Sequence, residues 1–145
     1  MIRKAQQTDI KALISIESAT FTEDDYPLSR GSFYYHIKNN PLYIFTKNGK
    51  VVGYILWFKR KSYYRLYSLS VLEEYRKIGV AQALFEHSLE KLKAQSYTLE
   101  VKTTNNSAIK FYEKNGFKKV KILKGFYPKG QDGLFMKKPS SLKIT

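Results

Sequence analysis

The chain has 145 residues, of which 43% are hydrophobic and 15% aromatic, and this favours one folded domain over residues 1–145 rather than a disordered chain. It has no cysteine and two histidines, which excludes disulfides, thiolate metal sites, cysteine nucleophiles and a multi-histidine metal centre, so we expect no metal cofactor. The formal net charge of +14 indicates an anionic partner, such as nucleic acid, an acidic membrane surface or a phosphorylated cofactor.

The first half of the chain predicts a strand, two helices and an antiparallel meander. We expect a strand at residues 1–5 and helices that Thr8 and Ser29 cap. The apolar face of the first helix comprises Ile10, Leu13, Ile14 and Glu17. Three strands follow, at residues 42–46, 51–58 and 63–71. Asn48-Gly49 predicts a hairpin between the first two of these, because both central residues of a type I′ turn need a positive φ.

The second half alternates helices and strands. Apolar residues at helical spacing predict helices at about 79–93 and at 107–115, the latter ended by Gly116. The remaining strands are predicted at residues 97–102, 117–123 and 134–138. The order β-α-α-β-β-β-α-β-α-β-β predicts an α/β (α+β) fold, with a mixed, mostly antiparallel sheet of about seven strands and helices on both faces.

Residues 69–84 run from a strand through a short basic loop directly into a helix. The N–H groups of the first helical turn, with the positive end of the helix dipole, form an anion site, and Arg76 and Lys77 add positive charge. A pyrophosphate would fit there. The segment has neither a Gly-x-Gly-x-x-Gly pattern nor a P-loop. A basic helix N-terminus with a turn glycine is the simpler interpretation of this loop taken alone.

Two segments together resemble the signatures of the GNAT superfamily of N-acetyltransferases. The acetyl-CoA loop of that superfamily, Gln/Arg-x-x-Gly-x-Gly/Ala, is similar to Arg76-Lys77-Ile78-Gly79-Val80-Ala81. Its second signature resembles residues 99–117, which contain Leu-Glu-Val, an asparagine loop and Ala-Ile-x-x-Tyr-x-x-x-Gly-Phe. Within the superfamily the chain is most similar to the bacterial ribosomal-protein-alanine N-acetyltransferases. The resemblance covers nearly the whole chain and is densest from Leu69 to Phe117.

The resemblance implies a GNAT-like fold and an acetyl-CoA-dependent N-acetyltransferase that acts by direct attack of a primary amine. We expect the acceptor to be the N-terminal α-amine of a protein, such as a ribosomal protein. We expect the enzyme to be cytoplasmic and to associate with ribosomes. The resemblance assigns cofactor binding to Leu69, Ser70, Val71, Arg76, Lys77, Ile78, Gly79, Val80, Ala81, Gln82, Asn105 and Tyr112.

Acetyl transfer needs a base for the attacking amine and an acid for the leaving thiolate. The resemblance places Tyr112 beside the sulfur as the acid, and the ordinary pKa of tyrosine, about 10, keeps it protonated at neutral pH. It makes Glu100 the base and Asn105 a hydrogen-bonding partner of the cofactor. The alternatives are a core tyrosine, a strand glutamate paired with a lysine, and an asparagine that only caps the next helix.

Other classes of protein remain open at this level. The chain could be a small-molecule amine acetyltransferase, acting on a polyamine or an antibiotic-type amine, or a non-catalytic module that binds RNA or coenzyme A. The tyrosine-rich strand at residues 63–67 would suit base stacking, although specific nucleic-acid binding is not expected.

No membrane association is expected, because the longest uncharged apolar run, Val51–Phe58, is too short to span a bilayer. The resemblance places the acidic residues Glu23, Asp24 and Asp25 at the acceptor side, where they would attract a cationic amine, although a solvated loop is the simpler interpretation.

Overall fold

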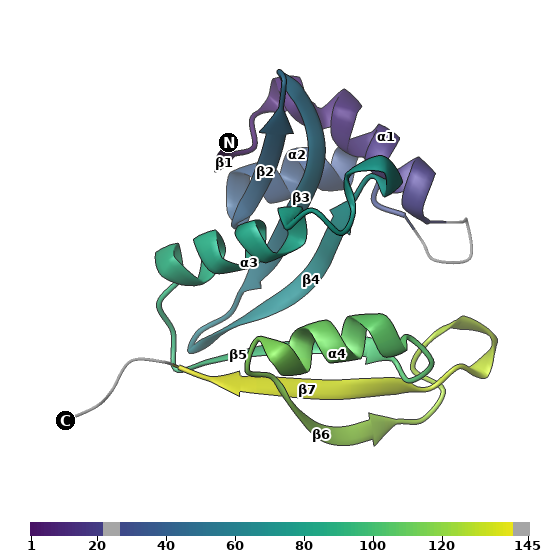
Figure 1. Ribbon diagram of the computed structural model, residues 1–145. Helices are drawn as coiled ribbons and strands as arrows, with labels where there is room; N and C mark the ends of the chain where they lie inside the picture. The colour runs from purple at the N-terminus through teal and green to yellow at the C-terminus, as the bar shows by residue number, and fades with distance from the viewer. Residues whose placement is uncertain (22–26, 141–145) are drawn as a thin grey trace. The chain divides into compact units, whose positions relative to one another are not determined.

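The computed structural model describes residues 1–21 and 27–140, and their strands and helices follow the predicted order. The acidic residues 23–25 therefore lie outside the described residues. Seven strands are hydrogen-bonded in the order β1-β2-β3-β4-β5-β7-β6 (Figure 1). Only the β4–β5 pair is parallel among the strand pairs whose registers are resolved, so the sheet is mixed and mostly antiparallel, as predicted.

The chain divides into two compact units. Unit 1 comprises Met1–Lys59 and Tyr67–Leu92, and unit 2 comprises Arg60–Leu66 and the chain from Lys93 onward. Unit 1 holds β1 (Ile2–Lys4), α1 (Ile10–Thr20), α2 (Arg30–Asn39), β2 (Leu42–Lys47), β3 (Lys50–Lys59), the end of β4 (Tyr63–Val71) and α3 (Val80–Lys91). Unit 2 holds the start of β4, β5 (Ser96–Lys102), α4 (Asn106–Lys114), β6 (Lys118–Leu123) and β7 (Gly133–Pro139).

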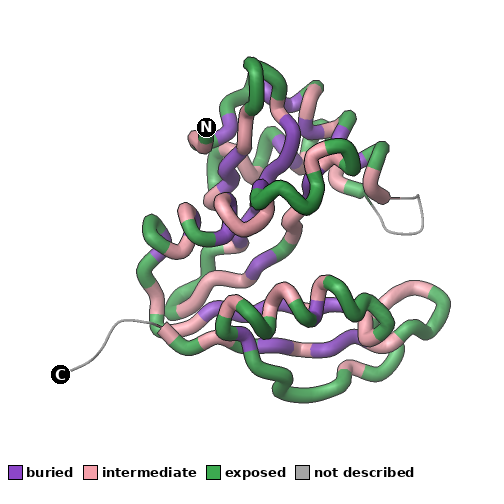
Figure 2. The backbone as a smooth tube through the Cα atoms, in the orientation of Figure 1, coloured by how far each residue is buried: buried purple, intermediate pink, exposed green. Residues whose placement is uncertain are grey.

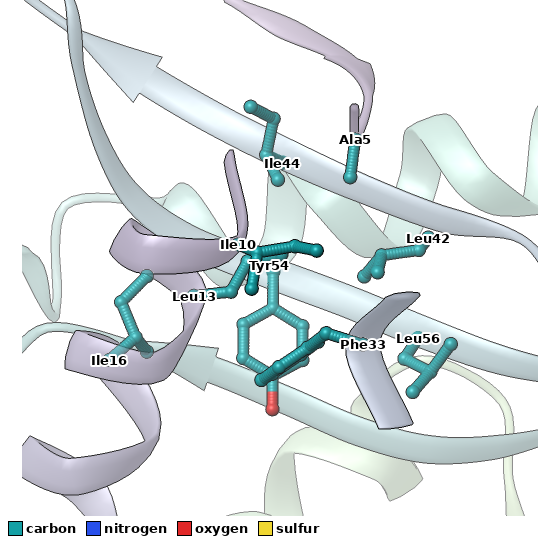
Figure 3. Packing of buried hydrophobic residues seen from close by; sticks show 9 residues of the cluster. All are labelled: Ala5, Ile10, Leu13, Ile16, Phe33, Leu42, Ile44, Tyr54 and Leu56. Atoms are coloured by element: carbon teal, nitrogen blue, oxygen red, sulfur yellow. The ribbon is translucent and has the colours of Figure 1, made fainter. Parts of the chain in front are cut away.

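In unit 1 the central strands are buried on both faces. Alternate residues of β2 and β3 pack with α1 and α2, where they form a cluster with Phe33 (Figure 3). The intervening residues face α3: Trp57 contacts Phe85, and Tyr43 contacts His87. Successive strand residues point to opposite faces of the sheet. Because helices cover both faces here, β3 is a nearly continuous apolar run. Each fully buried large side chain there stabilises the fold by roughly 1.5–3 kcal/mol.

A buried carboxyl interrupts this apolar cluster. Glu17 is only 3% exposed, and its Oε1 accepts a hydrogen bond from the Tyr54 hydroxyl. Its Oε2 accepts from the backbone N–H of Leu28 at 2.7 Å, and the Tyr54 hydroxyl also lies 2.8 Å from Ser68 Oγ. Burial raises the pKa of Glu17, and the hydrogen bonds from Tyr54 and Leu28 only partly oppose the rise. The group thus joins α1, β3, β4 and Leu28, which lies just before α2.

The first predicted cap is wrong and the other turn signals are confirmed. Thr8 lies inside a one-turn 3-10 helix, Gln7–Asp9, and does not cap α1; instead Asp9 accepts from the N–H of Gln6 at 2.7 Å and pairs with Arg3 at 2.8 Å. These contacts of Asp9 close the turn around Thr8, so Thr8 lies within a helical turn and not at the extended N-cap position that its hydroxyl would need. Ser29 caps α2 by accepting from the N–H of Ser32 at 3.1 Å.

The predicted glycine turns also form. Asn48 and Gly49 have φ of 52° and 77°, as a type I′ hairpin turn requires, and Gly116 ends α4 with φ of 96°. None of the described helices is both long and apolar enough to cross a membrane.

In unit 2, α4 packs on one face of the strands. The start of β4 pairs in parallel with β5, and β7 lies between β5 and β6 in antiparallel pairing. Ile109 of α4 and Leu134 of β7 are both buried and line one groove, which places them on the same side of the sheet (Figure 1).

Candidate functional site

The first part of the site is the loop that follows β4 in unit 1. After Val71 the chain forms a one-turn 3-10 helix, Glu73–Tyr75, and α3 begins at Val80. Lys77 and Gly79 have φ of 64° and 91°, in the left-handed region that glycine adopts without steric cost. Two left-handed residues in this short connection reverse the chain from the strand into the helix.

The N-terminus of α3 is open. Gly79 stands at the N-cap and has no side chain with which to accept from the N–H groups of the first turn. Apart from its chain neighbours, no described residue lies within 4 Å of where a Cβ on Gly79 would stand. Arg76 and Lys77 are exposed beside it. A helix N-terminus without a capping side chain, the helix dipole and two cations fit a diphosphate, which is the anionic group of coenzyme A expected here.

The loop is held by contacts that sequence reasoning missed. Arg76 Nε donates to the Val71 carbonyl at 2.9 Å, which fixes the loop to the end of β4. A Cβ on Gly53 of β3 would lie 3.1 Å from the Ser70 carbonyl oxygen and 3.2 Å from Val80, so glycine at this position allows β4 and α3 to approach β3 closely. The available signal was a lone glycine inside a strand, which often marks close backbone approach.

Glu100 lies on β5 in unit 2 and is paired with an arginine. Its Oε1 accepts from Arg65 Nε at 2.8 Å and lies 2.7 Å from Arg65 Nη2, and its side chain is 13% exposed. The pairing partner is an arginine on the adjacent strand rather than a lysine. A two-point contact with a guanidinium fixes the orientation of the carboxylate and still leaves it lone pairs for a proton.

Tyr112 lies on α4 in unit 2. Its ring makes edge-on contacts with Phe111 and Phe117, with centroids 5.6 and 5.9 Å apart. The residue as a whole is half-buried, and burial of its hydroxyl raises the pKa of Tyr112 to about 12. The hydroxyl is therefore a proton donor throughout the neutral range.

Asn105 caps α4. Its Oδ1 accepts from the N–H of Ala108 at 3.2 Å, so the capping role that the sequence also allowed is confirmed. The residue is exposed, and its side-chain amide group can still donate to a ligand.

The expected site residues fall into two groups. The ten that the sequence analysis places along residues 69–82 all belong to unit 1, on the end of β4, the loop and the start of α3. Glu100, Asn105 and Tyr112 belong to unit 2, on β5 and α4.

Comparison with known proteins shows the class of enzyme to which this seven-stranded mixed sheet, with a helix N-terminus following β4, belongs. The model of the acetyltransferase (GNAT) family matches residues 10–117, and the chain belongs to this family. It is an N-acetyltransferase, because relatives along nearly its whole length carry that name. It is 37% identical to an N-alpha-acetyltransferase of Saccharolobus solfataricus, over 95% of this chain and 92% of that protein.

Bacterial relatives and solved structures agree. The chain is 26% identical to the ribosomal protein bS18-alanine N-acetyltransferase of Escherichia coli, over 97% of this chain and 98% of that one. The crystal structure of the ribosomal-protein-S18-alanine N-acetyltransferase from Escherichia coli superposes with a TM-score of 0.87 over 99% of this chain and 96% of that chain, at 26% identity. Ard1 from Thermoplasma volcanium superposes with a TM-score of 0.88 at 28% identity, over 99% and 98% of the two chains. The predicted GNAT fold is thus confirmed.

Proposed function

We propose that this enzyme transfers the acetyl group of acetyl-CoA to the N-terminal α-amine of a protein. The observation that carries the proposal is the open N-terminus of α3, with Gly79 at its cap and two exposed cations beside it. This site suits the diphosphate of coenzyme A, and the family generally uses acetyl-CoA. The printed names of relatives, N-alpha-acetyltransferase and ribosomal-protein-alanine N-acetyltransferase, support the α-amine as acceptor.

The loop and strand residues bind and orient the thioester in this proposal. The first-turn N–H groups from Val80 to Gln82 receive the diphosphate, while Arg76 and Lys77 offset its charge. Backbone groups at Leu69 and Val71 pair with the amides of the pantetheine arm, in the manner of an added strand. A backbone N–H near Val71 donates to the carbonyl oxygen as it becomes negative in the tetrahedral intermediate.

The two titratable residues of unit 2 move the protons. The neutral amine nitrogen attacks the thioester carbonyl carbon, and its surplus proton passes to the Glu100 carboxylate, directly or through water. When the intermediate collapses, the carbon–sulfur bond breaks and the thiolate takes the proton of the Tyr112 hydroxyl. The chain has no cysteine, which fits direct transfer without an acyl-thiol enzyme.

The proposal is tested with the purified protein, acetyl-CoA and a panel of short peptides that differ in their first residue. We expect release of free thiol and a gain of one acetyl group at the peptide α-amine, located by tandem mass spectrometry. Peptides with a blocked N-terminus and one internal lysine serve as the control for side-chain acetylation. Thiol release with spermidine but with none of the peptides would favour a small-molecule acceptor instead.

Gly79→Ala should weaken acetyl-CoA binding about tenfold, because the added Cβ strains a residue at φ of 91° and disturbs the first-turn N–H groups. The matched control is Gly49→Ala, which places the same strain at φ of 77° in the β2–β3 hairpin, also in open space. Isothermal titration calorimetry measures both dissociation constants. Equal weakening in the two variants would contradict a diphosphate site at Gly79.

Glu100→Gln should lower kcat/KM for peptide acetylation about 100-fold near neutral pH, since the amide cannot take the proton of the amine. Glu113→Gln, an exposed position on α4, is the control of equal charge change. Initial rates over a range of pH, with thermal unfolding to verify the fold, make the measurement. A Glu100→Gln enzyme that keeps the rate and pH profile of the control would remove Glu100 as the base.

A further inference from the structure

The excess positive charge belongs almost entirely to one unit. The described residues of unit 2, 60–66 and 93–140, carry fourteen arginine and lysine side chains against three acidic ones. Two of those acids are already in ion pairs, Glu100 with Arg65 and Asp132 with Lys124. Counted over the whole sequence of each unit, unit 1 has eleven basic and nine acidic residues, and unit 2 has fifteen basic and three acidic ones. This uneven distribution of charge indicates that unit 2 has a negatively charged partner.

Strand register gathers several of these cations on one face of the sheet. One row of paired residues crosses four strands. Lys118 of β6 pairs with Lys137 of β7, and Lys137 pairs with Thr98 of β5. Thr98 pairs in turn with Arg65 of β4. The next row on the same face contains Lys121, Phe135 and Glu100. Directly paired residues share a face. Arg65 on this face is already paired with Glu100, so the face presents three exposed lysines and one aromatic ring. We call these residues the basic sheet face: Lys118, Lys121, Phe135 and Lys137.

The basic sheet face lies opposite α4. Leu134 and Met136 alternate with Phe135 and Lys137 along β7 and are buried, and Leu134 lines a groove with residues of α4. The three lysines of the basic sheet face are exposed, and Figure 2 shows β6 exposed along its length. In the described part of unit 2 the only helices are α4 and the one-turn 3-10 helix Pro128–Gly130, so no second helix of this unit covers the face.

This arrangement stabilises the folded protein poorly by itself. Like charges directly opposite each other on neighbouring strands are destabilising, and Lys118 faces Lys137 in this way. The three lysines lie in two successive rows on the adjacent strands β6 and β7, which are about 4.8 Å apart. A single carboxylate would neutralise one or two of them, whereas a chain of phosphates places a charge beside each. The half-buried ring of Phe135 lies among them, where a base could stack.

We propose that the basic sheet face binds the phosphate backbone of RNA without sequence specificity. Lysine side chains are point charges on flexible stems and suit phosphate contacts that hold a protein near RNA without selecting bases. An enzyme whose acceptors are protein N-termini would gain access to ribosomes from such contacts. The inference rests on the charge distribution of unit 2 and goes beyond the proposed function without requiring it.

The test compares two triple variants with the same change in net charge. Lys118→Gln, Lys121→Gln and Lys137→Gln remove the lysines of the basic sheet face, and Lys4→Gln, Lys11→Gln and Lys47→Gln remove exposed lysines of unit 1. The probe is a fluorescein-labelled, single-stranded RNA of 20 nucleotides and mixed sequence, with a second RNA of shuffled sequence. Fluorescence anisotropy at several KCl concentrations gives dissociation constants, and thermal unfolding verifies that each variant is folded.

We expect the wild type to bind both RNAs equally well. The unit 2 variant should bind at least tenfold more weakly at low salt, and its slope of log K against log[KCl] should fall by about 2, the value for three lost phosphate contacts. The unit 1 variant should resemble the wild type. Equal losses in both variants, or no RNA binding by the wild type, would overturn the proposal.

A polyglutamate peptide of 20 residues distinguishes an acidic protein partner. If it displaces the RNA at equal charge concentration and depends on the same lysines, the proposal of RNA is overturned in favour of an acidic polypeptide. The outcome is independent of catalysis: failure of the wild type to acetylate peptides would remove the proposed function and leave the RNA measurement unaffected.

Discussion

Tyr112→Phe should lower kcat for peptide acetylation by about 100-fold and change the dissociation constant of acetyl-CoA less than about twofold. The substitution removes one oxygen and keeps the ring, so the edge-on contacts of the ring with Phe111 and Phe117 remain. Without the hydroxyl the departing thiolate takes its proton from water. The loss therefore falls on the chemical step rather than on binding.

The pH dependence gives an independent check on Tyr112. Because burial raises its pKa to about 12, the hydroxyl stays protonated up to about pH 11, and its deprotonation should cause no decline in rate below that pH. Tyr64→Phe, a half-buried tyrosine of the same unit, is the matched control. Steady-state rates between pH 6 and 10, in terms of kcat and KM separately, make the measurement. A normal kcat in Tyr112→Phe would remove the assignment of the acid.

Glu17→Ala should lower the free energy of unfolding by about 2–4 kcal/mol, an expected effect on stability as large as that of a core truncation. The change leaves the backbone N–H of Leu28 without its carboxylate partner, takes an acceptor from the Tyr54 hydroxyl and opens a cavity beside the cluster shown in Figure 3. Ser18→Ala, the exposed neighbour on α1, is the control and should change stability by less than about 0.5 kcal/mol. Urea unfolding at pH 7 measures both.

The sign of the pH dependence separates the charge of Glu17 from its packing. Burial raises the pKa of Glu17, so its protonated form is favoured more in the folded than in the unfolded protein. Its contribution to stability is therefore full below the ordinary pKa of glutamate and is lost as the pH rises through the higher folded value. The glutamine of Glu17→Gln cannot ionise, so this variant lacks the loss. The free energy of unfolding of the wild type, relative to that of Glu17→Gln, should therefore be higher at pH 4 than at pH 8. A constant difference between the two proteins would contradict the raised pKa.

Glu17 also shows what local sequence patterns do not predict. Its helical spacing placed it on the apolar face of α1, but the pattern gave no partner for its carboxyl group. Its partner Tyr54, and Ser68 beyond it, come from strands far along the chain, and the contact of Tyr54 with Glu17 exists only after those strands have packed. The same holds for Thr8: the 3-10 turn in which it lies is closed by Asp9, whose partner Arg3 comes from β1, and this turn moves Thr8 away from the N-cap position of α1.

The sequence by itself determined what depends on neighbouring residues and on spacing: the order of strands and helices, the Asn48-Gly49 turn, the Ser29 cap, the Gly79 loop and, through its motifs, the family. These features are encoded within a few residues, because backbone conformation and helix ends are local properties. Only the tertiary structure decided that Arg65 pairs with Glu100, that Gly53 gives β4 and α3 their close approach to β3, and that Lys118, Lys121 and Lys137 share one face. Register between strands distant in sequence sets these neighbours, and no short segment of the chain contains that information.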